Sequence, residues 1–242
     1  MPTVTTNVAA NTALRFLNIN TMATNSSIGK LSSGSRIVKA SDDAASLAIS
    51  TNLNVDVVVL QQAAINASHG TAVSQVADGG LARISDILAR MKALATQSLS
   101  GSVDATSRGY INSEFTQLRD EITSIAQQTE FNGTELLSGA ATALNFMVGR
   151  TATDTITVTT VVSTATGLAV NAATVDTITN ATAAVALITT AIGTTNTNRA
   201  TFGSYMSRFD FRGQNVATQI ENISAAKSAL LDTDIAAEMV KF

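Results

Sequence analysis

The side chains that commonly carry out enzyme chemistry are scarce in this sequence of 242 residues. There is no cysteine, and His69 is the single histidine. Zinc motifs with two histidines and metal sites built on thiolates are therefore excluded by residue type. A serine nucleophile would need His69 as its base, but the sequence has no GxSxG motif. Because the glycine-rich pieces also match neither a Walker A loop nor GxGxxG, we expect no enzyme activity, no cofactor and no metal.

Two pairs of carboxylates stand close together in the sequence. Asp42 and Asp43 follow a serine, and Asp232 and Asp234 lie near the C-terminal end. Aspartate oxygens accept hydrogen bonds from the free N–H groups of a first helical turn, and the helix dipole favours negative charge there. We therefore interpret both pairs as helix-capping groups in preference to calcium ligands. His69, flanked by small residues, is interpreted as a partly exposed helix residue.

The charge pattern narrows the range of partners. The net charge is −3, and basic and acidic residues are interspersed, which disfavours nucleic-acid binding. No apolar run approaches the roughly 18 residues of a membrane-spanning helix, so we expect no membrane insertion. Residues 1–7 lack the basic and apolar regions of a secretory signal. The chain is expected to stay in the cytoplasm or to leave it without a cleaved signal peptide.

Helical periodicity dominates both ends of the chain. Hydrophobic residues make up 45% but aromatic residues only 4%, and Pro2 is the single proline. Apolar positions spaced alternately by three and four residues predict helices on which these residues form one narrow apolar stripe. We call such a stripe, which packs against other helices, a seam. The seam over residues 10–31 is weakened by Thr21 and Thr24. A longer seam, over residues 49–95, keeps its register through Gly70 and two further glycines, each costing about 1 kcal/mol relative to alanine. A third seam covers residues 111–125.

The most regular seam runs over residues 181–230. A helix of this length would extend for roughly 75 Å at 1.5 Å per residue, and so sustained a pattern indicates coiled-coil packing. Thr195, Arg199 and Lys227 are polar residues on this seam. Either their aliphatic parts pack while their polar heads reach water, or they set the register of packed helices or let them slide.

A different pattern separates the third and fourth helices. Leu144, Phe146 and Val148 alternate with other residues, and Ile156 and Val158 alternate with threonines. With the turn-like stretch between them, these runs predict a β-hairpin near residues 142–162. Residues 150–180 are rich in Thr and Ala and are expected to form a loop or a cap. The predicted fold class is thus mainly α, a long coiled-coil-like helical bundle rod with a small β-hairpin region.

Three segments stand out by the order of their residues. The first is LSSGSRIVKASDDAA from Leu31, the second is QTEFNGTELL from Gln128, and the third joins NISAAK from Asn222 to LDTD from Leu231 and to Glu238-Met239. In this order and at this spacing they resemble the signature segments of bacterial flagellins. The resemblance covers about residues 1–140 and 181–242.

The resemblance implies a domain organisation. We expect an inner helix segment at 1–40, the N-terminal part of a helical rod at 41–140, the hairpin and Thr-rich loop at 141–180, and the C-terminal part of the rod at 181–242. The short central region implies a short form without large outer variable domains. Flagellins normally continue with another amphipathic helix, so the end at Phe242 implies a C-terminal truncation. Because the seam over residues 10–31 is weak and an isolated helix of that size is marginal in water, the N-terminal helix is expected to rely on contacts from neighbouring subunits or a partner.

The resemblance also implies a function. We expect a structural subunit that polymerises into the flagellar filament for swimming motility, outside the cell, after export by the flagellar type III system without a cleaved signal peptide. The implied partners are copies of the chain itself, the export apparatus, an export chaperone and the cap protein. Arg90, Leu94, Gln97 and Glu114 partly match a site that contacts a Toll-like receptor or a neighbouring protofilament. Ala93 stands where an acidic residue is usual, so weaker receptor recognition is expected.

Two other functions remain open at this level. A hook–filament junction protein has similar ends, but it commonly carries proline after the double aspartate, whereas this chain has Ala44. A flagellin-like surface adhesin would use the Thr-rich loop at 150–180, whose hydroxyls could equally carry glycans. The scarcity of aromatic rings near that loop counts against sugar stacking.

Overall fold

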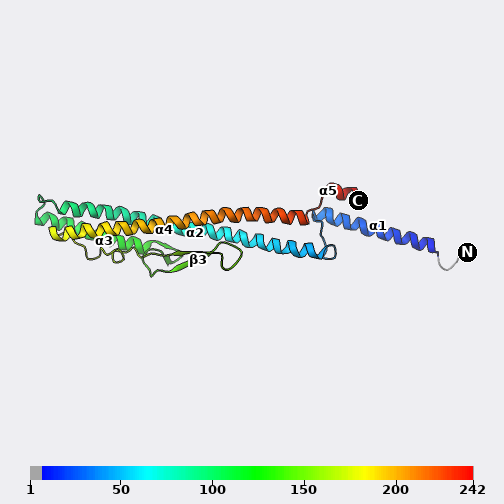
Figure 1. Ribbon diagram of the computed structural model, residues 1–242, viewed down its shortest axis with the longest axis horizontal. Helices are drawn as coiled ribbons and strands as arrows, with labels where there is room; N and C mark the ends of the chain where they lie inside the picture. The colour runs from blue at the N-terminus through cyan, green and yellow to red at the C-terminus, as the bar shows by residue number, and fades with distance from the viewer. Residues whose placement is uncertain (1–6, 242) are drawn as a thin grey trace. The chain divides into compact units, whose positions relative to one another are not determined.

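The computed structural model describes residues 7–241, and residues 1–6 of the predicted inner segment lie outside this range (Figure 1). Five helices are described: α1 (Val8–Ser33), α2 (Ala44–Ser98), α3 (Ala105–Gln128), α4 (Ile178–Leu231) and α5 (Ile235–Lys241). Strand β1 (Glu130–Phe131) pairs with β2 (Thr134–Glu135), and β3 (Ala143–Met147) pairs with β4 (Thr155–Thr159), both antiparallel. The predicted mainly α class is confirmed.

The chain forms two compact units. The smaller unit comprises residues 1–59 and 218–242, and the larger comprises residues 60–217. Helices α2 and α4 each contribute to both units. These boundaries differ from the predicted domain boundaries, which stay a prediction.

The larger unit has its core between α2, α3 and α4. The predicted seam residues of α2 from Leu60 onward are mostly buried, and Leu81, Ile84 and Leu88 are wholly inaccessible. Helix α3 contributes Phe115 and Ile122 to the same core, and α4 contributes the following buried residues: Ala181, Ala184, Ile188, Ala191, Phe202 and Phe209. The three-and-four spacing thus identified the buried faces of these helices within residues 60–217, because residues at this spacing share one side of a helix.

The hairpin predicted near residues 142–162 is confirmed as β3 and β4. Its register places Phe146 opposite Ile156 and Leu144 opposite Val158. Ile156 and Val158 are buried, whereas the threonines that alternate with them are exposed. Because successive strand residues point to opposite faces, this alternation turns one face of the hairpin toward the helices. Phe146 meets Phe209 of α4 edge to face, with ring centroids 5.5 Å apart.

The Thr-rich loop that follows β4 contributes to the core. Its apolar residues are buried: Ala165, Leu168, Val170, Ala173 and Val175. Ser98, at the end of α2, donates a hydrogen bond of 2.6 Å to the carbonyl oxygen of Val175, and Val175 N–H donates to Asn112 Oδ1 of α3 at 2.9 Å. The sequence analysis expected a loop or a cap here and missed this buried role, because the many threonines masked the scattered apolar positions.

Two glycines of α2 allow close approach of other segments. A Cβ at Gly70 would lie 2.3 Å from Phe209 Cζ of α4, and a Cβ at Gly80 would lie 2.6 Å from Thr129 Oγ1 and 2.8 Å from Leu137 Cδ1. Glycine lowers the helix propensity at both positions, but it leaves the space that the neighbouring side chains occupy.

By length and composition alone, α2 and α4 are each long and apolar enough to cross a membrane. Two such helices are weak evidence, because other kinds of helix meet the same criteria. The finding therefore carries little weight for a membrane span.

Candidate assembly surface

Helix α1 is well defined at both ends but is mostly exposed within the described part of the chain. Asn7 accepts a hydrogen bond from Ala10 N–H at 3.1 Å as its N-cap, and Gly34 ends the helix with φ at 67°, a left-handed conformation. Ser27 is its single buried residue. Its large apolar side chains are exposed: Val8, Leu14, Phe16, Leu17, Ile19, Met22 and Ile28, with exposures from 47% to 72%. We call these seven residues the α1 apolar surface.

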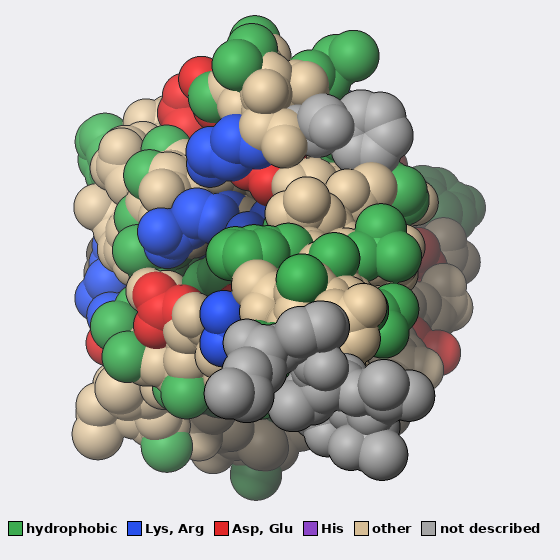
Figure 2. Space-filling model, turned by 90° about the vertical axis from the view of Figure 1, so that its right-hand side faces the viewer, with side chains coloured by type: hydrophobic (Ala, Val, Ile, Leu, Met, Phe, Trp, Pro, Cys, Tyr) green, Lys and Arg blue, Asp and Glu red, His purple; other side chains and the backbone are tan. Residues whose placement is uncertain are grey.

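The described residues of the smaller unit bury little apolar surface. Among its described hydrophobic residues only Ile37 is buried, at 6% exposure. Other large apolar residues of this unit are exposed, namely Val38, Ile49, Val55, Val58, Ile235, Met239 and Val240. Figure 2, which looks onto the right-hand side of Figure 1, shows apolar side chains, in green, open at the surface. Exposed apolar surface of this extent marks an interaction site, and isolated helices are marginal in water without such packing.

Main-chain hydrogen bonds join the two terminal segments of the smaller unit. Arg36 N–H donates to the carbonyl oxygen of Leu231 at 2.6 Å, and Thr233 N–H donates to that of Gly34 at 3.1 Å. The Arg36 guanidinium also donates to the carbonyl oxygen of Leu230 at 3.1 Å. The first and third signature segments therefore meet here, although almost 200 residues separate them in the sequence. The spacing of residues along the chain does not predict that these two segments pair.

Asp42 and Asp43 hold the turn between α1 and α2. Asp43 Oδ1 accepts from Ser46 N–H at 3.0 Å and so caps α2, as the sequence predicts. Asp42 Oδ2 accepts from Lys39 N–H at 2.9 Å and from Val38 N–H at 3.1 Å. These two backbone donors lower the pKa of Asp42, and the Ser46 hydroxyl and N–H lower the pKa of Asp43.

The second pair of aspartates divides its roles. Asp234 Oδ1 accepts from Ala237 N–H at 3.0 Å and caps α5, in agreement with the predicted capping role. Asp232 is no N-cap, because it forms a β-bridge with Ser35 and its carboxylate accepts from the Ser228 hydroxyl. Within residues 7–241, no group of three or more acidic or histidine side chains is placed to hold a metal ion.

A buried hydrogen bond ties α5 to α1. Ser27 Oγ donates to Glu238 Oε1 at 2.8 Å, and Lys241 Nζ lies 3.1 Å from Glu238 Oε2. The bond from Ser27, and then the one from Lys241, lower the pKa of Glu238. The sequence analysis missed both α5 as a separate helix and this contact. The capping residue Asp234, which follows Leu231 closely, was the available signal for a new helix start.

The residues predicted to contact a receptor or a protofilament lie in the larger unit. Arg90 of α2 donates to Glu114 Oε1 of α3 through Nε at 2.9 Å and through Nη2 at 2.7 Å, and both side chains stay partly exposed. Gln97 is exposed. Leu94, however, is 1% exposed and packs in the core, because it shares the α2 seam with Met91. The structure therefore places three of the four at the surface, and their contact role stays a prediction.

The polar residues of the long α4 seam find partners across the helices. Arg199 Nε lies 2.8 Å from Asp78 Oδ1 of α2, and Lys227 Nζ donates to Asn54 Oδ1 at 2.7 Å. Thr195 is fully buried and donates to the carbonyl oxygen of Ala191 in its own helix. The heads of Arg199 and Lys227 thus bind α2, and a role in register or sliding stays a prediction.

Comparison with known proteins places both ends of the chain in one family. Residues 4–142 match the bacterial flagellin N-terminal helical region, and residues 185–242 match the bacterial flagellin C-terminal helical region. A flagellar filament 30.7 kDa core protein of Treponema maltophilum is 33% identical over 98% of this chain and 88% of its own length. Flagellin D of Vibrio cholerae is 43% identical over 60% of this chain, and the match spans 39% of that protein's own length.

A solved structure is similar as well. The crystal structure of Bacillus cereus flagellin aligns with a TM-score of 0.59 at 32% identity, covering 67% of this chain and 94% of that one. The comparisons and the geometry agree on long helices in the N-terminal and C-terminal regions of the chain.

Proposed function

Because this chain belongs to the bacterial flagellin family and is a structural subunit of the flagellar filament, an extracellular assembly, we propose that it polymerises by covering its α1 apolar surface with other copies of itself. The observation that carries the proposal is the contrast between the two units. The larger unit buries an extensive core, whereas the smaller one buries a single hydrophobic residue among those described. Covering apolar surface stabilises association by roughly 25 cal/mol per Å².

The same contrast supports a route of export through a narrow channel. A segment with little core of its own loses little stability when it is unfolded. We propose that the chain leaves the cell through the flagellar type III apparatus without a cleaved signal peptide, helped by an export chaperone, and is added to the filament beneath a cap protein. Its role is structural, and we propose no catalytic activity.

The exposed part of the predicted contact site is proposed to serve neighbouring protofilaments. The ion pair between Arg90 and Glu114 ties α2 to α3 at the surface, and Gln97 lies two turns further along α2. A Toll-like receptor would meet the same three side chains. The hook–filament junction function is not favoured, because two relatives that each match 98% of the chain are named as a flagellar filament core protein and a flagellin.

An assembly assay on the full chain tests the α1 apolar surface. Purified protein is concentrated, sedimented and viewed by negative-stain electron microscopy. Leu14→Asn with Leu17→Asn should leave the protein in the supernatant, because two apolar contacts with other copies are lost. The matched control, Asn18→Ser with Asn20→Ser, alters exposed polar residues of the same helix and should assemble normally. Failure of the unaltered chain to form filaments under any condition, or normal assembly of the double leucine variant, would overturn the proposal.

Proteolysis supplies a second test. In the unassembled chain, α1 should be cleaved well before the larger unit, and assembly should protect it. Resistance of α1 in unassembled protein would show that the helix needs no partner.

A further inference from the structure

Two exposed rows of residues run along the outer faces of α3 and α4 in the larger unit. On α3 the row consists of Tyr110, Gln117, Glu121 and Gln128, and on α4 it consists of Ser204, Arg208, Phe211 and Asn215. Steps of three, four and seven residues keep each row on one side of its helix. Tyr110 is 74% exposed and Phe211 is 71% exposed. We call the first row the acidic stripe and the second the basic stripe.

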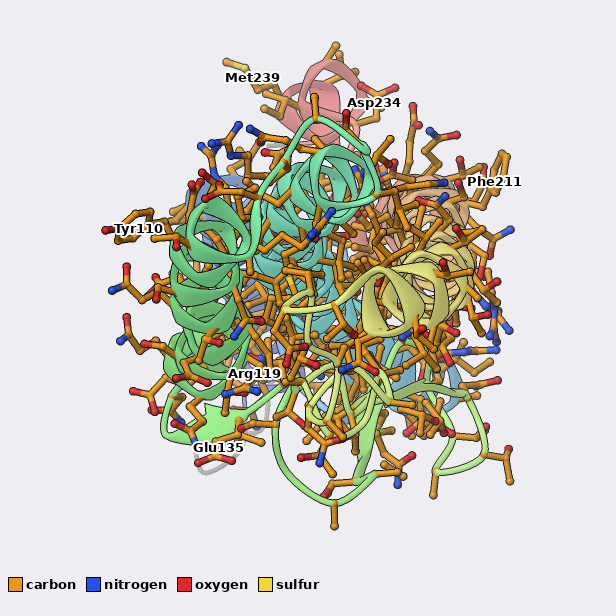
Figure 3. All side chains as sticks on the ribbon, turned by 90° about the vertical axis from the view of Figure 1, so that its left-hand side faces the viewer. Tyr110, Arg119, Glu135, Phe211, Asp234 and Met239 are labelled. Carbon is orange, nitrogen blue, oxygen red and sulfur yellow. The ribbon has the colours of Figure 1, made fainter. Side chains whose placement is uncertain are left out.

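The two stripes face in opposite directions. Viewed along the bundle, Tyr110 projects from the α3 side and Phe211 from the α4 side, pointing away from each other (Figure 3). No contact between the stripes is therefore available within one chain, whereas two copies lying side by side would bring them together.

The charged residues that lie on the two stripes have no partner within the described part of the chain. Glu121 and Arg208 make no hydrogen bond or ion pair with any of the described residues 7–241. Two charged neighbours already act within the chain: Arg119 pairs with Asp120 and bonds the carbonyl oxygen of Asn171, and Arg212 helps to lower the pKa of Asp154. The carboxylate of Glu121 and the guanidinium of Arg208 thus lie on opposite sides of the larger unit.

The basic stripe borders a surface groove that can receive a helix edge. The groove has a volume of about 420 Å³ and is lined by Thr155, Ile156, Arg208, Phe211, Arg212 and Asn215. The exposed ring of Phe211 lies there beside the guanidinium groups of Arg208 and Arg212. A helix that presents a carboxylate among polar side chains matches this lining. Asp210 lies on another side of α4, where it lines a separate groove with Gly213 and Gln75.

We propose that the acidic stripe of one copy packs against the basic stripe of the next, with Glu121 of one copy beside Arg208 and Arg212 of the other. This inference rests on the proposed filament function. A contact between two different surfaces repeats from copy to copy and generates a ring or a helical filament, unlike a two-fold contact. It also explains why each subunit keeps one stripe on each side.

The proposal fixes a register. Helices α3 and α4 run in the same direction, since the chain leading into α4 at Val175 bonds Asn112 near the start of α3. Neighbouring copies related by a small rotation keep that common direction. Because Gln117 lies one turn before Glu121 and Ser204 one turn before Arg208, Gln117 of one copy should lie near Ser204 of the next.

Site-directed cross-linking tests this register, since the sequence contains no cysteine. The variant with Gln117→Cys and Ser204→Cys, treated with a short bismaleimide after assembly, should give a ladder of multimers. Either single variant alone should give none, and a mixture of the two single variants should give dimers. The matched control, Gln117→Cys with Thr190→Cys, moves the second thiol about 21 Å along α4 and should not cross-link. Filaments without a ladder, or with an equal ladder in the control, would overturn the proposal.

Charge reversal tests the electrostatic contact. Glu121→Arg, or Arg208→Glu, should raise the critical concentration for assembly roughly tenfold, because an attraction is replaced by a repulsion of similar size. Combining both reversals should restore assembly. Arg83→Glu, an exposed reversal outside both stripes, is the control, and circular dichroism checks that each variant is folded.

The outcomes separate the two proposals. If the unaltered chain never assembles, the proposed function fails. If it assembles and the single reversals assemble equally well, the stripe contact alone fails.

Discussion

Replacing Gly70 with alanine is expected to destabilise the larger unit, although alanine is the better helix former. Gly70 is a buried residue in the middle of α2, and Phe209 of α4 lies over it. A Cβ added at position 70 would lie 2.3 Å from Phe209 Cζ and 2.4 Å from Cε1. Carbon atoms in contact are normally about 3.5–4.0 Å apart, so the ring or the helix must move.

Two opposing effects set the magnitude. Alanine gains about 1 kcal/mol over glycine in a helix interior, whereas overpacking a core costs about 1–3 kcal/mol. The Phe209 ring cannot easily swing away, because it is 1% exposed and packs edge to face against Phe146. Overpacking therefore prevails, with a net loss of about 1 kcal/mol. In a unit of this size that lowers Tm by about 2–4 °C.

Gly79→Ala is the matched control in the same helix. Nothing lies within 4 Å of a Cβ added there, so this variant should be stabilised by about 1 kcal/mol. Urea unfolding of unassembled protein, followed by circular dichroism, measures both variants. A second substitution, Phe209→Leu, should recover part of the stability lost in Gly70→Ala, because the two sites are in contact. If Gly70→Ala proved as stabilising as Gly79→Ala, the reasoning would be refuted.

Two further predictions concern the smaller unit. Ser27→Ala removes the hydroxyl that donates to Glu238. Amide hydrogen exchange in α5 should therefore become several-fold faster, while exchange in α3 stays unchanged. Unchanged protection of α5 would contradict this contact. The lowered pKa values of Asp42, Asp43 and Glu238 mean that their hydrogen bonds stabilise the fold fully above the ordinary carboxyl pKa of about 4. This stabilisation is lost as pH falls through the lowered values. Hydrogen exchange across an acid titration should therefore show the α1–α2 turn and α5 opening before the larger unit, and simultaneous opening would argue against it.

The elements that depend on local physics were predictable from the sequence. Alternating steps of three and four identified the buried faces of α2, α3 and α4 within the larger unit, since residues at that spacing share one side of a helix. Alternation by two residues identified the hairpin that contains Phe146 and Ile156. Asp43 and Asp234 were interpretable as caps, because a cap bonds backbone groups within three residues of itself.

The candidate assembly surface was only half predictable. The weak seam over residues 10–31 indicated that α1 needs a partner, and its apolar side chains are indeed exposed. Leu94 was grouped with surface residues, yet the core contains it, because a motif match does not show which way a helix turns. The apolar residues of the Thr-rich loop were missed because loop residues follow no period.

The sequence by itself determined where the long helices lie and which stripe of α2, α3 and α4 is apolar in the larger unit, but it did not separate α5 from α4. Only the tertiary structure decided what each stripe meets. It places Phe209 on the bare backbone of Gly70, Ser27 beside Glu238, and Arg36 beside Leu231. It also sends Tyr110 and Phe211 to opposite sides of one bundle. Such pairings join residues far apart in the chain, and they depend on how whole helices pack, which no local spacing encodes.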